Sequence, residues 1–124
     1  MDEFKPESAH DNFLRCFRAG DLEGLVALYE SDATMVLADG TTHAGQAAIR
    51  AALGGFLAVG RNLELKTRYA ARNGDLALLS NEWRLQGFDA DGKALELSGR
   101  TAEVVRRHTD GRWRYVVDHP WGGQ

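Results

Sequence analysis

The hydrophobic pattern of this 124-residue chain changes period near its middle, and that change limits the folds it can adopt. Apolar residues recur at helical spacing through the first 60 residues, whereas residues 63–71 alternate apolar and polar side chains. The alternating stretch ends at Asn73-Gly74, a strong hairpin signal. The sequence therefore predicts helices followed by an antiparallel sheet of consecutive hairpins, which is an α+β arrangement.

Three helices are expected in the first half of the chain. Gly20 provides a stop for the first helix, and Asp21 can cap the N-terminus of the second. The Asp39-Gly40 pair predicts a turn between two short strands that precede the third helix. The expected helices span residues 8–20, 22–30 and 46–59, and the two short strands span residues 34–37 and 41–43.

The second half predicts a meander of four strands. These strands are expected at residues 63–73, 75–88, 93–107 and 112–120, with turn residues between them. No repeat or linker interrupts the chain, so residues 1–124 are expected to form a single domain. In this arrangement the three helices must cover one face of a curved sheet.

Composition excludes several classes of partner and location. A net charge of −3 offers no basic surface for phosphate backbones, so nucleic acid is not an expected partner. Cys16 is the only cysteine and cannot form an internal disulfide. Because no apolar stretch has the length of a signal peptide or a membrane span, we expect a cytoplasmic protein without a membrane partner.

The sequence also lacks the common cofactor motifs. It contains no P-loop, no glycine fingerprint for dinucleotides and no Gly-x-Ser-x-Gly elbow. Its four histidines are far apart, and none has a second ligand at metal-binding spacing. We therefore expect neither a cofactor nor a metal ion.

Four short motifs, in this order, resemble a known family. They are FRAGDLEGLVALY at residues 17–29, DAT at residues 32–34, GQAAIR at residues 45–50 and GRWRYVV at residues 111–117. Together they resemble the nuclear transport factor 2-like superfamily, and within it the ketosteroid isomerase and SnoaL-like polyketide cyclase branch. The resemblance implies a cone-shaped α+β barrel, in which a strongly curved antiparallel sheet wraps around the helices and leaves an apolar cavity at the wide end.

The family's isomerase pattern can be compared with this chain position by position. In that pattern a helix tyrosine and a protonated acid stabilise an oxyanion, while an aspartate transfers the proton. The tyrosine position corresponds to Phe13 and the aspartate position to Leu37, neither of which can perform its role. The acid position corresponds to Glu103, so one of the three groups is kept.

Strand periodicity identifies which side chains share a face. A three-residue loop at residues 109–111 would place Glu103 opposite Val117 and Thr101 opposite His119, with Asp118 on the outer face near Arg100. The odd positions of strand 75–88 would face the cavity. The expected lining residues are Phe13, Phe17, Leu37, Phe56, Leu79, Asn81, Trp83, Thr101, Glu103, Val105, Val117, His119 and Trp121.

Glu103 and His119 are the candidate catalytic residues. Burial would favour the neutral form of the Glu103 carboxyl, which could then donate a hydrogen bond or act as a general acid, with His119 as a base. Alternatively, Glu103 is a rim carboxylate paired with Arg84 or Arg106, and His119 is solvated. His10 is expected to be exposed in the first helical turn, although it could reach the cavity mouth.

These features favour a small hydrophobic molecule as the ligand, with three alternative functions. The chain could be a cofactor-free isomerase, cyclase or dehydratase-like enzyme that uses Glu103 and His119. It could bind the same ligand without turnover, or it could be a dimerisation domain with an incidental pocket. A homodimer is expected in each case, because no helix remains to cover the outer face of the sheet.

We predict that the protein has no appreciable steroid isomerase activity. Phe13 and Leu37 remove a hydrogen-bond donor and a base, and loss of one oxyanion donor alone costs about 100-fold or more in rate. The measurement is turnover of a β,γ-unsaturated ketosteroid. Turnover near that of a true isomerase would contradict this prediction.

Overall fold

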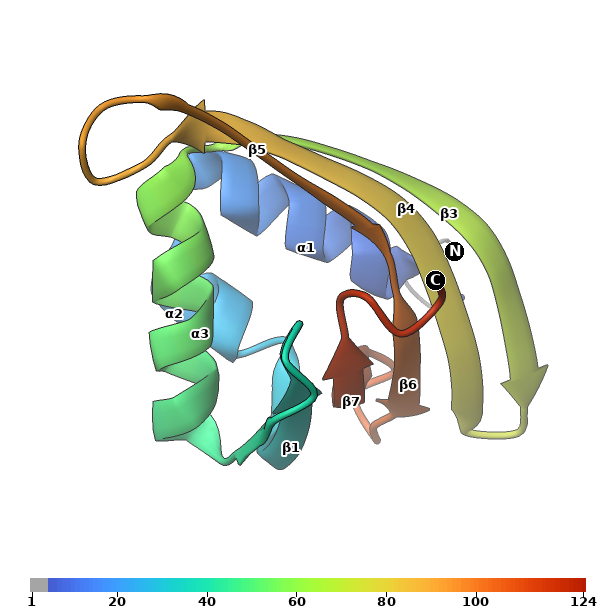
Figure 1. Ribbon diagram of the computed structural model, residues 1–124. Helices are drawn as coiled ribbons and strands as arrows, with labels where there is room; N and C mark the ends of the chain where they lie inside the picture. The colour runs from blue at the N-terminus through green and yellow to red at the C-terminus, as the bar shows by residue number, and fades with distance from the viewer. Residues whose placement is uncertain (1–4) are drawn as a thin grey trace.

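The computed structural model describes residues 5–124, which form three helices and one curved sheet (Figure 1). The helices are α1 (Ser8–Ala19), α2 (Leu22–Val26) and α3 (Gln46–Val59). The strands are β1 (Tyr29–Val36), β2 (Thr42–Ala44), β3 (Asn62–Asn73), β4 (Leu76–Phe88), β5 (Ala94–Arg100), β6 (Ala102–Arg107) and β7 (Trp113–His119). This architecture confirms the predicted α+β fold with helices packed on a strongly curved sheet.

The sheet differs from the prediction in two respects. Its strand order is β2-β1-β7-β6-β4-β3, with β5 pairing β4 outside that path. The pairing of β1 with β7 is parallel, whereas the other pairings are antiparallel, so the sheet is mixed. β2 and β3 are the two ends of the path, so the sheet is not closed into a barrel.

The second helix is shorter than predicted, and the first strand is longer. α2 ends at Val26, and β1 already begins at Tyr29, which pairs with Tyr115 of β7. The backbone N–H of Tyr115 donates to the carbonyl of Leu28 over 2.8 Å. Tertiary pairing with β7 therefore overrides the helical spacing of the apolar residues here.

The predicted strand 93–107 is two strands separated at Thr101. β5 pairs with residues 82–88 of β4, and β6 pairs with residues 76–79. Between these two ladders, the Thr101 N–H donates to the carbonyl of Asn81 over 2.9 Å, and the Asn81 N–H donates to Thr101 Oγ1 over 2.9 Å. The break allows one long strand, β4, to support both ladders as it curves.

The helix boundaries at residues 20 and 21 match the prediction. Gly20 adopts the left-handed conformation with φ of 69°, and its N–H caps α1 through the carbonyl of Phe17. The Asp21 side chain accepts a hydrogen bond from the Gly24 N–H over 2.9 Å and so caps α2. These local signals are strong enough to be read from sequence.

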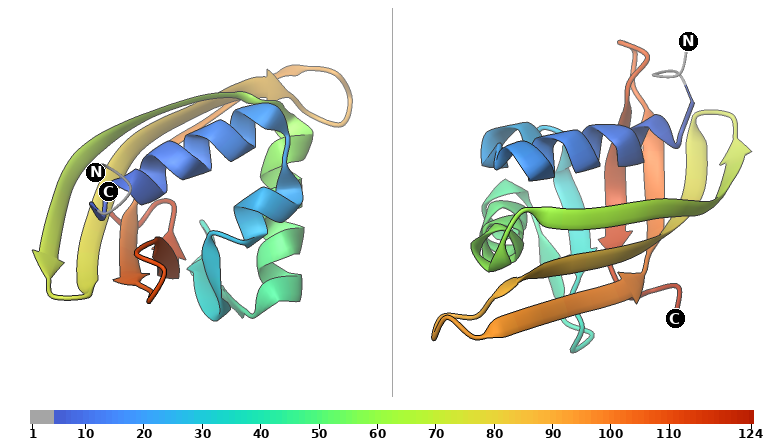
Figure 2. Two further views of the ribbon diagram at one scale, coloured as in Figure 1. Left: turned by 180° about the vertical axis from the view of Figure 1, so that it is seen from behind. Right: turned by 90° about the horizontal axis from the view of Figure 1, so that it is seen from above.

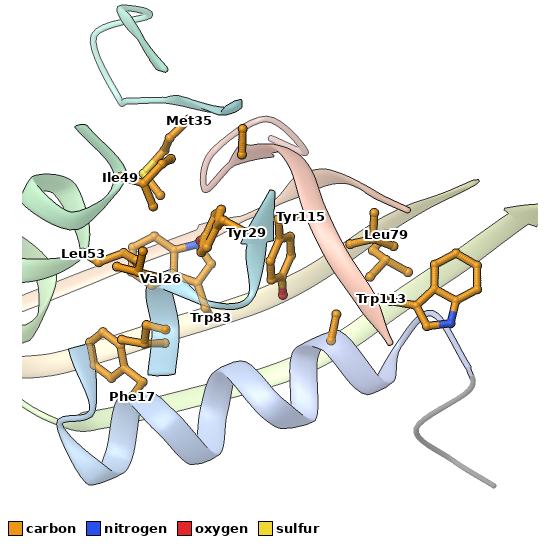
Figure 3. Close-up of a cluster of buried hydrophobic side chains, with 14 of the residues drawn as sticks. Phe17, Val26, Tyr29, Met35, Ile49, Leu53, Leu79, Trp83, Trp113 and Tyr115 are labelled. Atoms are coloured by element: carbon orange, nitrogen blue, oxygen red, sulfur yellow. The ribbon is translucent and has the colours of Figure 1, made fainter. Parts of the chain in front are cut away.

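α1 lies along the concave side of the sheet, and α3 stands near one end of it (Figures 1 and 2). Apolar side chains from these helices and from the inner face of the sheet form the core (Figure 3). Its largest fully buried hydrophobic members are Phe17, Leu25, Met35, Ile49, Leu53, Leu79, Leu85, Val105 and Tyr115. Within residues 5–124, no helix is long and apolar enough to cross a membrane.

We predict that the convex face of the sheet forms a homodimer. Leu76 and Leu78 of β4 are 43% and 42% exposed there, and Val104 lies opposite Leu78. Sedimentation equilibrium at micromolar concentration should give twice the 13.7 kDa mass of the chain. Leu78→Glu should shift the mass towards the monomer, whereas Phe88→Glu, at the far end of β4, should not. A wild-type monomer would contradict this prediction.

Candidate functional site

An apolar cavity lies between the helices and the concave face of the sheet. It has about 470 Å³ of free volume including the open solvent at its mouth, so a compact ligand fits best. Its polar end consists of Asn81, Thr101 and Glu103, which are adjacent in the hydrogen-bond network. The remaining lining residues are Phe13, Phe17, Phe56, Leu63, Leu65, Trp83, Leu85, Tyr115 and Pro120.

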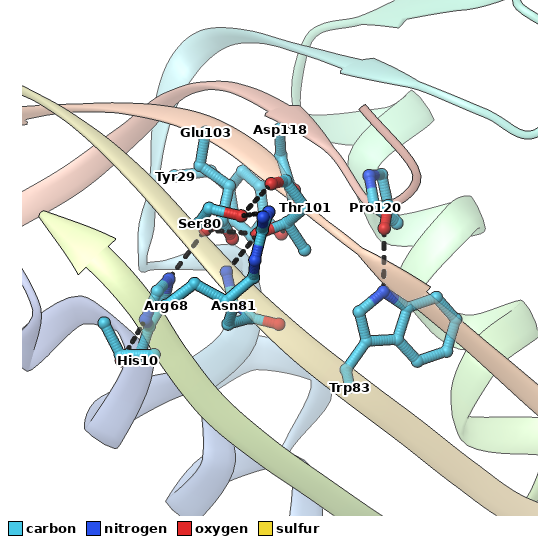
Figure 4. A network of polar contacts seen from close by, with 11 residues as sticks. His10, Tyr29, Arg68, Ser80, Asn81, Trp83, Thr101, Glu103, Asp118 and Pro120 are labelled. Atoms are coloured by element: carbon cyan, nitrogen blue, oxygen red, sulfur yellow. Dashed lines mark hydrogen bonds and ion pairs between the residues drawn. The ribbon is translucent and has the colours of Figure 1, made fainter. Parts of the chain in front are cut away.

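Glu103 is buried on the inner face of β6, where it pairs with His10 of α1 (Figure 4). His10 Nε2 and Glu103 Oε1 are 2.6 Å apart, and the two residues are 1% and 4% exposed. The other ring nitrogen of His10, Nδ1, lies 2.7 Å from the hydroxyl of Thr67 on β3. Both polar ends of the imidazole are therefore held by the sheet.

The directions of the hydrogen bonds around Thr101 identify which oxygen of Glu103 faces a ligand. Thr101 Oγ1 accepts from the Asn81 N–H, so its proton is free to donate to Glu103 Oε1 over 2.9 Å. His10 Nε2 also reaches Oε1. Both bonds thus end on one oxygen, which leaves Oε2 as the oxygen that can meet a ligand.

Asp118 is a second buried carboxyl beside this pair. It lies opposite Glu103 in the β6–β7 ladder, and the Tyr29 hydroxyl donates to Asp118 Oδ2 over 2.5 Å. Burial, reinforced by the charge of Glu103, raises the pKa of Asp118 to about 8. Asp118 is therefore mostly protonated at neutral pH.

Asn81 presents an unsatisfied amide at the polar end of the cavity. Its side-chain oxygen is buried and has no hydrogen-bond partner within residues 5–124. Buried polar atoms almost always have a partner, and an orphan costs about 1–3 kcal/mol. An orphan acceptor in the wall of a cavity is typical of a group that meets a ligand.

The cavity contains most, but not all, of the predicted lining residues. Phe13, Phe17, Phe56, Asn81, Trp83, Thr101 and Glu103 line it. Leu37 and Trp121 instead line an open apolar groove beside α3, which shares Phe56 with the cavity. Leu79 and Val105 are fully buried in the core, and Val117 is half-buried.

His119 does not share a face with Glu103, in contrast to the predicted register. A β-bulge in β7 shifts the pairing, so that Glu103 lies opposite Asp118 and His119 opposite Ala102. His119 is half-buried, and its Nδ1 accepts from the Trp121 N–H over 3.3 Å. The extra residue turns Asp118 inward and moves His119 away.

The expected ion pairs at the sheet rim are also different. Glu103 is paired with neither Arg84 nor Arg106, because these arginines bind Glu64 and Glu30, respectively. Arg100 forms an ion pair with Glu82 over 3.0 Å, and Asp118 instead accepts a hydrogen bond from the Tyr29 hydroxyl.

Sequence reasoning missed several residues of the site. His10 was expected to be exposed, yet it is 1% exposed, and its spacing from Phe13 and Phe17 on one helix face was the signal that could have placed it. The inward Asp118 was missed because of the bulge, and Tyr29 was missed because it was assigned to the second helix. Tyr115 lies opposite Val105, as the predicted register implies, so strand alternation could have placed it on the inner face. Leu63, Leu65, Leu85 and Pro120 were also not predicted to line the cavity.

Acidic, histidine and cysteine side chains do not converge on a metal site in the described part of the chain. Within residues 5–124, no three of them lie close enough to hold a metal ion. The polar end of the cavity presents one carboxylate, one amide and one hydroxyl.

We predict that Asp118 makes folding stability fall as pH rises from about 4 towards 8. Its pKa is about 8 in the fold, against an ordinary value of 3.8, so the folded state holds a proton that the unfolded state has released in this range. One such proton gives a slope of at most about 1.4 kcal/mol per pH unit. Urea unfolding between pH 5 and 8 should show a flatter profile for Asp118→Asn.

Asp110→Asn is the matched control for that experiment. Asp110 is exposed, and its hydrogen bonds with Arg114 and the Arg112 N–H lower its pKa to about 2, so it does not titrate between pH 5 and 8. This variant should keep the wild-type slope. Equal slopes for Asp118→Asn and the wild type would show that Asp118 is ionised throughout.

Solved structures with the same fold include proteins from several bacteria. A ketosteroid isomerase-like protein from Erwinia carotovora atroseptica matches 95% of this chain and 93% of its own, with a TM-score of 0.82 and 14% identity. A conserved protein from Planctomyces limnophilus matches 95% and 93%, with a TM-score of 0.80 and 17% identity. An NTF-2 like protein of unknown function from Shewanella oneidensis matches 90% and 92%, with a TM-score of 0.73 and 16% identity.

These similarities show the fold alone, because the identities are low. No curated protein sequence matches the chain. The model of the SnoaL-like domain, however, matches residues 10–116, which include α1 from His10 onwards, every cavity-lining residue except Pro120, and the first four residues of β7. The chain therefore belongs to the SnoaL-like domain family, within the nuclear transport factor 2-like fold.

Proposed function

We propose that this protein binds a small, largely apolar molecule in its cavity and that Glu103 exchanges a proton with it. The observation that carries this proposal is the pairing of Glu103 with His10 at the polar end of an otherwise apolar cavity. Such a site combines a hydrophobic wall for binding with a few oriented polar groups for specificity. The SnoaL-like family supports a ligand-binding, isomerase or cyclase type of function.

The contacts of Glu103 suit a general acid–base residue. His10 and Thr101 hold Oε1 in place, and the free Oε2 can reach a ligand atom. His10 can stabilise either protonation state of the pair, since its ring nitrogens donate or accept according to the tautomer. In this proposal His10, and not His119, is the histidine that pairs with Glu103, and Glu103 itself is the base.

A reaction of this kind needs no cofactor. A carboxylate can remove a proton from carbon next to a carbonyl and return it elsewhere, which gives isomerisation, or allows ring closure or loss of water. Phe13 and Leu37 lack the donor and the base of a true ketosteroid isomerase. The reaction proposed here therefore relies on Glu103.

Binding without turnover is the second candidate. The His10–Glu103 contact also fixes α1 to the sheet, which is a purely structural task. A ligand that binds without reacting would be enough to give the unpartnered side-chain oxygen of Asn81 a hydrogen bond. A measurement of proton transfer separates this candidate from the first.

Cyclohexanone in D₂O is a direct probe, because its α-protons exchange for deuterium when a base removes them. We predict that the wild-type protein accelerates this exchange and that Glu103→Gln lowers the acceleration at least about 10-fold. The amide keeps the volume of the side chain, so folding should be affected less. Proton NMR of the ketone measures the exchange in D₂O, and the indole N–H signal of Trp83, recorded in a separate H₂O sample, reports binding.

Glu82→Gln is the matched control, because Glu82 of β4 is an exposed carboxylate that forms an ion pair with Arg100 of β5. It should exchange cyclohexanone at the wild-type rate. Binding without accelerated exchange would favour the non-catalytic alternative. Equal exchange rates for Glu103→Gln and the wild type would exclude Glu103 as the base.

A further inference from the structure

Tyr115 places a phenol in the cavity wall that the proposed chemistry does not use. The residue is 1% exposed on the inner face of β7. Its ring stands edge-on to Phe13, with the ring centroids 6.2 Å apart. Figure 3 shows its hydroxyl oxygen on the side of the ring that faces α1.

The Tyr115 hydroxyl has no hydrogen-bond partner within residues 5–124. In that range, the Asn81 amide oxygen is the one fully buried side-chain polar atom without a partner. The unpartnered Tyr115 hydroxyl must therefore touch open space, and Tyr115 lines the cavity. Burial, followed by the charges of Glu103 and Asp118, raises the pKa of Tyr115, so the hydroxyl keeps its proton.

The neighbouring tyrosine of the core behaves differently. Tyr29 is 4% exposed, and its ring centroid lies 4.9 Å from that of Tyr115. Its hydroxyl donates to Asp118, so its hydrogen bond is satisfied within the fold. Two adjacent buried phenols thus differ in one respect, which is that only Tyr115 turns its hydroxyl to the cavity.

The free polar groups of the cavity form a complementary set. Tyr115 offers a donor, whereas Glu103 Oε2 and Asn81 Oδ1 offer acceptors. A hydroxyl group accepts one hydrogen bond and donates another, so it matches this set better than a ketone or an ether, which can only accept. Among residues 5–124, no lysine or arginine lines the cavity to compensate an anion, and Glu103 is already paired with His10.

We propose that Tyr115 is the hydrogen-bond donor of this cavity and that, together with the acceptor oxygens of Glu103 and Asn81, it selects an uncharged ligand whose polar group is a hydroxyl. This inference rests on the ligand-binding part of the proposed function, because it names the ligand class of the same cavity, and it does not depend on proton transfer by Glu103. It adds Tyr115 as a specificity-determining residue.

The test is a titration of the protein with four compact probes. Binding is measured from the shift of the Trp83 indole N–H signal in the NMR spectrum. Cyclohexanol can donate and accept, cyclohexanone and tetrahydropyran can only accept, and benzene does neither. We expect cyclohexanol to bind most tightly to the wild type. Tyr115→Phe should weaken binding of the three oxygen compounds by about 3- to 10-fold, the scale of one hydrogen bond, and leave benzene unchanged.

Two further variants separate the donor from the acceptors. Tyr29→Phe removes the neighbouring hydroxyl and should leave all four affinities unchanged. Asn81→Leu should reduce the advantage of cyclohexanol over cyclohexanone. Tyr115→Phe should keep the wild-type melting temperature, because the lost hydroxyl has no partner in the fold, and this checks that a weaker affinity is not caused by unfolding.

The outcomes distinguish this inference from the proposed function. If the wild type binds none of the four probes, the proposed ligand-binding cavity fails, and the inference fails with it. If benzene binds but cyclohexanol binds no more tightly than cyclohexanone, the cavity stands and the hydroxyl class is wrong. Unchanged cyclohexanol affinity in Tyr115→Phe would overturn the role of Tyr115.

Discussion

The contact between His10 and Glu103 is the interaction on which the arrangement of the site depends. It joins the first turn of α1 to β6 at 2.6 Å, with both side chains almost completely buried. Removing one partner of a buried pair of this kind typically costs about 3–5 kcal/mol, because the other is left without compensation. The contact therefore fixes the helix against the sheet and also orients the carboxyl that faces the cavity. Structural and chemical roles meet in one hydrogen bond.

Two β-bulges decide which polar side chains reach this pair. The bulge in β3 falls between Thr67 and Tyr69. Thr67, whose hydroxyl is hydrogen-bonded to His10, is the last paired residue before the inward and outward positions of the strand exchange. The bulge in β7 falls between Tyr115 and Val117, and it brings Asp118 to the inner face on which Tyr115 already lies. Without the second bulge, strand alternation would place Asp118 outside and His119 inside. The polar composition of the site is thus a consequence of strand irregularity.

Three aromatic rings pack together where the cavity and the open groove beside α3 share Phe56. Phe56, Trp83 and Trp121 pack with centroids 5.5–6.1 Å apart. Trp83 Nε1 donates to the Pro120 carbonyl, and Trp121 Nε1 donates to the Ser98 carbonyl, so both indoles are satisfied while their rings stay apolar. A Cβ at Gly99 would lie 2.8 Å from Trp121 Cδ1, which explains a glycine at this close approach. Polar chemistry and hydrophobic binding therefore occupy separate parts of one cavity.

The sequence by itself determined the order of the elements, the caps at Gly20 and Asp21, the hairpin whose turn follows Asn73 and the inward face of β4, because each follows from local periodicity or turn chemistry. It also identified Glu103 and Asn81 as inward polar residues. Only the tertiary structure decided their partners. His10 and Glu103 are 93 positions apart, and no local pattern encodes that contact. The exchange of His119 for Asp118 has the same origin, since a bulge inserts one residue into a strand without disturbing its local hydrophobic pattern, and its position is set by pairing with the neighbouring strands.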